Sequence, residues 1–157
     1  MKQFKLDKID RKILSQLQEK GRMTNVDLAK KAGISAPPCL RRVRALEEAG
    51  YIKGYNARLD AAALGYPVTI FAQVKLVSQA EADLKQFESL IQSWPMVREC
   101  HMLAGEMDFI LKIVAEDWDH YQHFLTEQLT AAPNVTSVKS SLAVREAKME
   151  PGVPVET

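Results

Sequence analysis

Three arginines lie close together in the stretch SAPPCLRRVRALEEAG, which covers residues 35–50. They are Arg41, Arg42 and Arg44. A guanidinium group binds phosphate, and it can donate two hydrogen bonds to O6 and N7 of guanine in the major groove of DNA. Apolar residues recur at helical spacing between the arginines, at Leu40, Val43 and Leu46. We therefore expect one helix that buries these apolar residues and projects its arginines from the exposed faces.

The charge of the chain is unevenly distributed. Residues 1–60 contain eight Lys and six Arg against seven acidic residues, a balance of +7. The remaining residues contain seven basic and thirteen acidic residues, a balance of −6, which gives the net charge of +1. A basic first half attached to an acidic second half indicates a polyanionic partner for the first half alone. The competing interpretation is a solvated surface on which the arginines pair with Glu47 and Glu48.

Two further helices are predicted before the arginine-rich one. Apolar residues at helical spacing predict a helix over residues 7–20, ended by Gly21. Thr24 then caps a second helix, with Asp27 in a capping box, and Gly33 ends it. Only Gly33 and Ile34 lie between this helix and the next cap, Ser35. Helices joined by so short a turn must cross at a steep angle, which predicts a helix-turn-helix.

The second helix of this motif commonly enters the major groove with its N-terminal part. Its N–H end also suits a phosphate group. The residues predicted to contact double-stranded DNA are therefore Ser35, Ala36, Pro37, Arg41, Arg42, Arg44, Lys30 and Lys31. Lys30 and Lys31 are expected to contact phosphates, as are Lys53 and Arg58.

Apolar and polar residues alternate over residues 67–77, at the start of the second half of the chain, which predicts a strand. Further strands are predicted over residues 97–104, 108–115 and 135–146. Helical spacing predicts helices over about 80–94 and from residue 118 to near Pro133. The order β-α-β-β-α-β is the ferredoxin-like pattern. Phe71 and Val77 suggest a subunit interface on the face that the helices leave open.

The predicted fold class is α+β, and the chain divides into four parts. Residues 1–59 form a winged-type helix-turn-helix domain, residues 60–66 a connector, residues 67–149 the ferredoxin-like domain and residues 150–157 a tail. No apolar run reaches the roughly 20 residues needed to span a bilayer. The charged start MKQFKLDKIDRK lacks a signal-peptide core, so we expect a cytoplasmic protein.

The motifs IDRKIL, LAKKAGIS, CLRRVRALE and GYIKGY resemble, in order and spacing, the Lrp/AsnC (leucine-responsive/asparagine-responsive) family of transcription regulators. The second half continues the resemblance with ECHMLAGEMDFILKI, and the likeness covers about residues 6 to 148. It implies that the β-α-β-β-α-β half is a RAM domain, which binds ligands and forms oligomers. It also implies dimers, often arranged as octamers or other rings, and a free amino acid as the effector.

The resemblance places the effector at a G-x-x-D turn and at two nearby elements. The implied residues are Leu103, Ala104, Gly105, Asp108, Trp118, Thr136, Ser140, Ser141, Leu142 and Ala143. Backbone N–H groups around Gly105 suit the effector's carboxylate, and Asp108 suits its ammonium group. On spacing alone the same two residues are typical of an ordinary turn. Small side chains on the last strand leave room for leucine or methionine.

Two other functions compete with an effector-responsive regulator. An enzyme is disfavoured, because His120 and His123 have no third ligand at metal-site spacing and no nucleophile motif or phosphate loop occurs. Cys100 and His101 are adjacent on a strand and point to opposite faces. We therefore expect no catalytic residue, metal or cofactor. A second alternative is an architectural DNA-binding protein without an effector, because such a protein would use the same helix-turn-helix.

Overall fold

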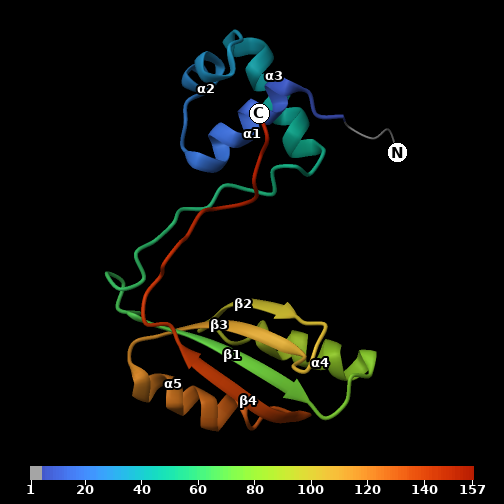
Figure 1. The fold of residues 1–157 in the computed structure, drawn as a ribbon, viewed down its shortest axis with the longest axis vertical. Coiled ribbons are helices and arrows are strands. Elements are labelled where there is room, and N and C mark those ends of the chain that lie inside the picture. Colours follow the sequence, from blue (N-terminus) through green and yellow to red (C-terminus); the bar gives the residue numbers. More distant parts are fainter. Residues whose placement is uncertain (1–4) are drawn as a thin grey trace. The chain divides into compact units, whose positions relative to one another are not determined.

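The computed structural model describes residues 5–157, which form two compact units (Figure 1). The first unit contains residues 5–58 together with Lys148–Thr157, and the second is Leu59–Ala147. The chain therefore passes between the units twice. Residues 150–157, which the sequence sets apart as a tail, lie in the same unit as the predicted helix-turn-helix.

Three helices build the first unit: α1 (Lys8–Glu19), α2 (Asn25–Ala32) and α3 (Ala36–Glu48). Their fully or nearly buried apolar residues form one core, made by Ile13, Leu28, Ala29, Ala32, Cys39 and Leu46. Thr24 caps α2 by accepting a hydrogen bond from the Asp27 backbone N–H. Gly33 ends α2 at φ 78°, a left-handed conformation that favours glycine. These features confirm the predicted helix-turn-helix.

The buried face of α3 differs from the prediction. Leu40 is 41% exposed, whereas Cys39 is completely buried. The helix buries Cys39 and Leu46 and partly buries Val43 between them, and the three residues follow one another at intervals of four and three. Leu40 directly follows Cys39 and is therefore rotated around the helix axis away from this row. The prediction that it is buried is wrong.

The second unit contains a four-stranded antiparallel sheet in the order β2-β3-β1-β4. Its strands are β1 (Val68–Leu76), β2 (Val97–Met102), β3 (Phe109–Ala115) and β4 (Val135–Leu142). The helices α4 (Glu81–Ile91) and α5 (Trp118–Phe124) connect β1 to β2 and β3 to β4, and a π-helical turn, η1 (Leu125–Leu129), extends α5. The predicted ferredoxin-like order and the α+β class are confirmed.

The two helices pack on one face of the sheet. Alternate residues of β1 and β3 are buried against Phe87 and Ile91 of α4 and against Tyr121 and Phe124 of α5. The residues between them point to the opposite face, where Phe71 is 40% exposed. Phe71 is in register with Lys112 on β3 and with Ser141 on β4. The open face therefore mixes an exposed aromatic ring with polar groups.

Candidate DNA-binding helix and effector site

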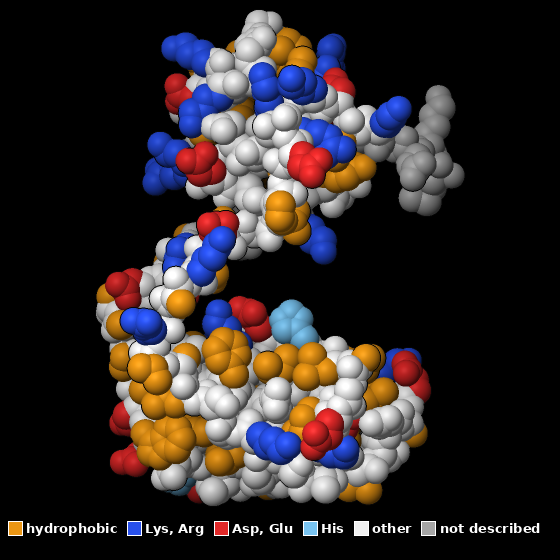
Figure 2. Space-filling model, viewed as in Figure 1, with side chains coloured by type: hydrophobic (Ala, Val, Ile, Leu, Met, Phe, Trp, Pro, Cys, Tyr) orange, Lys and Arg blue, Asp and Glu red, His pale blue; other side chains and the backbone are white. Residues whose placement is uncertain are grey.

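The outer face of α3 carries two arginines that are free to bind a partner. Arg41 and Arg44 are exposed, and neither forms an ion pair with an acidic residue in the described range 5–157. Pro37 lies on the same face, since residues 37, 41 and 44 recur at helical spacing. Figure 2 shows Lys and Arg side chains over much of the visible surface of this unit. This face therefore offers two guanidinium groups to a polyanion.

Arg42 faces the other way. Its Nη1 lies 2.7 Å from Oδ2 of Asp7 and 2.7 Å from Oδ1 of Asp10, and only 31% of its side chain is exposed. Hydrogen bonds to Asp10 and Asp7 raise the pKa of Arg42. The backbone hydrogen bond from Asp10 lowers the pKa of Asp7, and Arg42 lowers it further. The prediction that Arg42 projects from an exposed face is wrong, because its guanidinium joins α3 to the first turn of α1.

The start of α3 has few hydrogen-bond donors. Ser35 precedes the helix, but its side chain makes no capping hydrogen bond. An N-cap side chain normally accepts from the second or third helical N–H, and here Pro37 and Pro38 occupy those positions and have none. The helix end is therefore less suited to bind a phosphate through its backbone than the sequence suggested. The Ser35 hydroxyl is left available to a partner.

A basic depression lies beside the helix-turn-helix. It is lined by Lys20, Arg22, Met23, Thr24, Asp27, Lys30 and Lys31. Lys30 and Lys31, predicted to contact phosphate, thus lie beside two further cations, Lys20 and Arg22. Lys20 and Arg22 were not predicted to contact DNA, because they lie at and just after the end of α1, outside the predicted helix-turn-helix pair. Four cations around one depression would attract a phosphate backbone.

The turn between β2 and β3 is anchored by backbone hydrogen bonds at both ends, and Lys75 Nζ of β1 donates to its Glu106 carbonyl at 2.7 Å. The Leu103 N–H donates to the Asp108 carbonyl at 2.8 Å, and the Asp108 N–H donates to the Val74 carbonyl at 2.9 Å. Within the described chain, the backbone N–H groups of residues 104–107 donate to no protein acceptor. A Cβ added to Gly105 would meet no atom within 4 Å, and its φ is not in the left-handed range. The fold itself therefore does not require a glycine at this position.

Asp108 is directed into the protein. It is only 4% exposed. Its Oδ2 accepts from the Leu76 backbone N–H at 2.7 Å, and its Oδ1 accepts from Gln79 Nε2 at 2.7 Å. Both carboxylate oxygens thus bind groups at the end of β1 and just beyond it. This geometry argues against the predicted role of Asp108 as the acceptor for an effector's ammonium group.

The remaining predicted effector residues lie at the other end of the strands. Ser140 forms a hydrogen bond with the Tyr121 hydroxyl, and the Trp118 ring lies 5.4 Å from the Tyr121 ring. The N–H of Ala143 donates to the Thr69 carbonyl, where β1 begins. Ser141 and Leu142 precede it, and both are exposed. The structure therefore groups Trp118, Ser140, Ser141, Leu142 and Ala143 around the end of β4.

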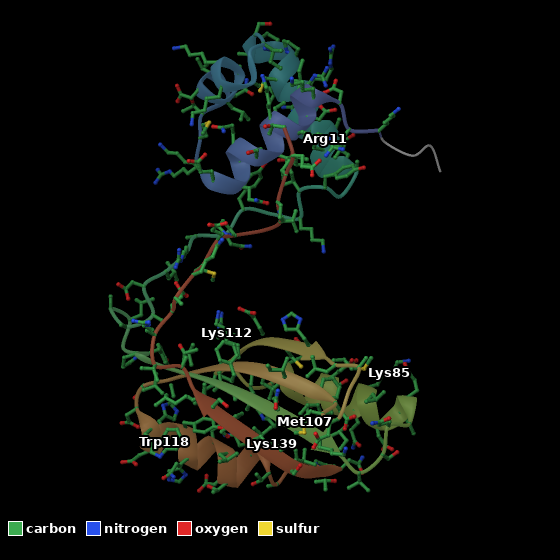
Figure 3. All side chains as sticks on the ribbon, viewed as in Figure 1. Arg11, Lys85, Met107, Lys112, Trp118 and Lys139 are labelled. Atoms are coloured by element: carbon green, nitrogen blue, oxygen red, sulfur yellow. The ribbon has the colours of Figure 1, made fainter. Side chains whose placement is uncertain are left out.

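These residues and the turn are not brought together within one chain. Val74 contacts the turn and pairs with Val138, whereas Ile70 pairs with Leu142, four residues away along β1. Four residues of a strand span about 13 Å. Figure 3 shows Trp118 and Met107, a residue of the turn, well separated along the sheet. Of the predicted β4 residues, only Thr136 lies at the turn's end, since its neighbour Ser137 pairs with Lys75.

The groups considered for catalysis remain isolated from one another. The described residues contain no cluster of three or more His, Cys, Asp or Glu side chains that could hold a metal ion. His123 pairs with Glu127 on the exposed side of the helix. Burial, with a smaller effect of Glu88, raises the pKa of Cys100 to about 11, so its thiol stays protonated near neutral pH.

Comparison with known proteins identifies both halves of the chain. Residues 6–53 match the family described as winged helix-turn-helix DNA-binding, and residues 69–153 match the Lrp/AsnC ligand binding domain. The chain belongs to the Lrp/AsnC family. The leucine-responsive regulatory protein of Rhizobium meliloti is 54% identical over 143 residues, which cover 91% of this chain and 92% of that protein. The Bkd operon transcriptional regulator of Pseudomonas aeruginosa is 42% identical and covers 96% of this chain and 98% of its own length.

Solved structures of Lrp/AsnC-type regulators have the same fold. A transcriptional regulator of Neisseria meningitidis in complex with L-methionine superposes with a TM-score of 0.91, at 35% identity, over 96% of this chain and 97% of that one. The AsnC structure of Escherichia coli gives 0.84 at 25% identity, over 93% and 97%. This chain is a transcriptional regulator with a DNA-binding helix-turn-helix and a ligand-binding domain, and it is not an enzyme. No helix in residues 5–157 is long and apolar enough to cross a membrane.

Proposed function

We propose that this regulator binds DNA by inserting the outer face of α3 into the major groove, and that a free amino acid modulates the binding. The observation that supports DNA binding by α3 is that its three arginines differ in their contacts. Arg41 and Arg44 are exposed and unpaired with acids in the described chain, while Arg42 is held by Asp7 and Asp10. Ser35, Ala36 and Pro37 lie at the start of the same helix. Lys30 and Lys31 contact flanking phosphates.

Replacing Arg41 or Arg44 by alanine is expected to weaken binding to a duplex by about 1–3 kcal/mol when the arginine reads a base. When it binds a phosphate, the logarithmic salt dependence of the association constant becomes shallower by about 0.9 for each phosphate that the variant no longer neutralises. Fluorescence anisotropy at four salt concentrations measures both quantities. Arg98→Ala, an exposed arginine of the second unit, is the matched control. Unchanged affinity and unchanged salt dependence in both α3 variants would rule out this face as the DNA-binding surface.

We infer that the turn formed by residues 103–108 binds the carboxylate of the effector. Four successive N–H groups without a protein acceptor are available to donate hydrogen bonds to an anion. The space around Gly105 allows a ligand to approach the backbone closely. An apolar amino acid such as methionine or leucine fits this proposal. The Neisseria meningitidis relative contains L-methionine, and several relatives are named leucine-responsive.

We also propose that the effector site is completed by a second copy of the chain. The turn and the group around Trp118 and Ser140 lie about 13 Å apart along the sheet, too far for one small amino acid to touch both. The open face of the sheet, with Phe71 exposed, is a surface through which two copies can associate. A ligand bound between copies would favour one assembly over another and so change DNA affinity by linkage. Such an assembly acts where the DNA is, in the cytoplasm.

Gly105→Ala is expected to abolish effector binding without unfolding the protein. The added methyl group meets no protein atom within 4 Å, and the backbone angle suits alanine, so the melting temperature stays close to that of the wild type. The same methyl group fills the space through which a carboxylate reaches the N–H groups. Isothermal titration calorimetry with L-methionine, L-leucine and the other amino acids measures the effect. A variant that retains wild-type affinity would refute the carboxylate role of the turn.

The architectural alternative makes a different prediction in the same experiment. A protein that only shapes DNA would bind duplex with strong salt dependence but would give no heat with any amino acid. The match of residues 69–153 to a ligand-binding domain favours the regulator that responds to an effector.

A further inference from the structure

The C-terminal segment is attached to α1 by a specific contact. Gln18 Nε2 donates to the Val153 carbonyl at 2.7 Å, and the Val153 N–H donates to Gln18 Oε1 at 3.0 Å. One side-chain amide thus satisfies both polar groups of one backbone residue, as a neighbouring strand would. Figure 1 shows this segment, in red, reaching α1.

The sequence of the segment fits this contact. Gly152 has φ 73°, a conformation that side chains rarely adopt, and a Cβ there would lie 2.0 Å from Gln18 Oε1. The backbone therefore favours glycine here, and any side chain at this position would displace the Gln18 amide from its contact with Val153. Pro151 and Pro154 flank the site, and each proline ring fixes its own φ, which lowers the entropy lost when the segment docks. Val155 is partly buried in the same unit.

The contact is not needed to complete the core of the first unit. The three helices bury their own apolar residues around Ile13 and Leu46, and no residue of the segment belongs to that core. The segment instead continues directly from β4, whose last residues are predicted effector contacts, through residues 143–147. The DNA-binding unit is thereby connected to both ends of the ligand-binding unit.

Two associated copies would present two α3 helices to DNA, and each helix would bind one half-site of a two-part DNA site. We propose that docking of residues 148–157 on Gln18 is a second tether that restricts the DNA-binding unit, so that the assembled regulator accepts fewer spacings between the two half-sites. This inference rests on the proposed DNA binding by α3 and on the proposed association of two copies. A unit held by one flexible linker can reach half-sites at many separations, whereas a unit held at both ends reaches fewer. The docked segment thus connects the first unit to β4, the strand that carries predicted effector contacts.

The test compares wild-type protein with Gly152→Val and Gln18→Ala, and Glu156→Gln in the same segment is the control. The probe is a duplex that the wild-type protein selects from a random-sequence pool, re-made with one to five base pairs inserted at its centre. Five base pairs are about half a helical turn. We expect this insertion to reduce wild-type and Glu156→Gln affinity about tenfold, and to reduce the affinity of the two undocked variants less than about threefold.

Hydrogen exchange measures whether the variants have lost the docking of residues 148–157 on Gln18. The Val153 N–H is expected to exchange slowly in the wild type and quickly in Gly152→Val, with unchanged protection in the core of the first unit. Fast exchange in the wild type would overturn the proposal, and so would equal spacing profiles for wild type and Gly152→Val. Failure of the wild type to select any duplex would instead refute the proposed DNA binding itself.

Discussion

Arg42→Ala is expected to lower both the stability of the DNA-binding unit and its affinity for DNA, while leaving the salt dependence of binding unchanged. The substitution removes the side-chain partner of Asp10, which is 3% exposed. Leaving a buried polar group without its partner costs about 1–3 kcal/mol, and more when the group is charged. DNA affinity falls because α3 loses its ion pairs with the start of α1 and is held to that helix only by apolar packing. The cations that face the phosphates are all still present, so the salt dependence stays the same.

Two companion variants distinguish this positioning role from direct DNA binding. Arg42→Lys should recover most of the stability, because one ammonium group can replace the single nitrogen, Nη1, that bonds both carboxylates. Asp10→Asn removes a negative charge from a DNA-binding unit, which by itself would strengthen DNA binding. Here it is expected to weaken binding, because it also weakens the α1–α3 connection. If Arg42→Ala kept full stability and made the salt dependence shallower, Arg42 would instead bind a phosphate directly.

The sequence predicted the elements well because helix and strand periodicity is a local property. The row of alternating residues on β1 and the capping of α2 by Thr24 can both be predicted from a few neighbouring residues. The buried face of α3 was harder to predict, because Cys39 and Leu40 are adjacent and both apolar. Periodicity from Leu40, Val43 and Leu46 fits a helix almost as well as periodicity from Cys39. Only packing against the other helices decides between them.

The site residues were harder to predict because their partners are distant in sequence. Arg42 and Asp10 are separated by 32 residues, and so are Asp108 and Leu76. A charged residue in a surface pattern looks the same whether it faces solvent or another element. Gly152 and Gln18, 134 residues apart, show the same limit: neither is unusual alone, and only the structure shows that the glycine makes room for the amide.

Asp108→Ala is expected to destabilise the ligand-binding unit by about 1–3 kcal/mol, with some loss of effector binding as a consequence. The alanine leaves the Leu76 N–H and the Gln79 amide without their acceptors at the end of β1. The turn formed by residues 103–108 then keeps only its hydrogen bonds to Val74 and Lys75 of that strand. Thermal unfolding followed by circular dichroism measures the loss of stability.

Asp108→Asn separates the structural role from the role predicted from sequence. The asparagine carbonyl can accept from the Leu76 N–H, and its NH2 group can donate to Gln79 once the Gln79 amide turns over. Stability and L-methionine affinity should therefore both stay near those of the wild type. An acceptor for the effector's ammonium group needs its negative charge, so on that hypothesis the same variant would fold normally and lose methionine affinity at least about tenfold. If Asp108→Asn folds normally but loses methionine affinity, Asp108 binds the effector directly. If it folds normally and keeps its methionine affinity, Asp108 only anchors the turn.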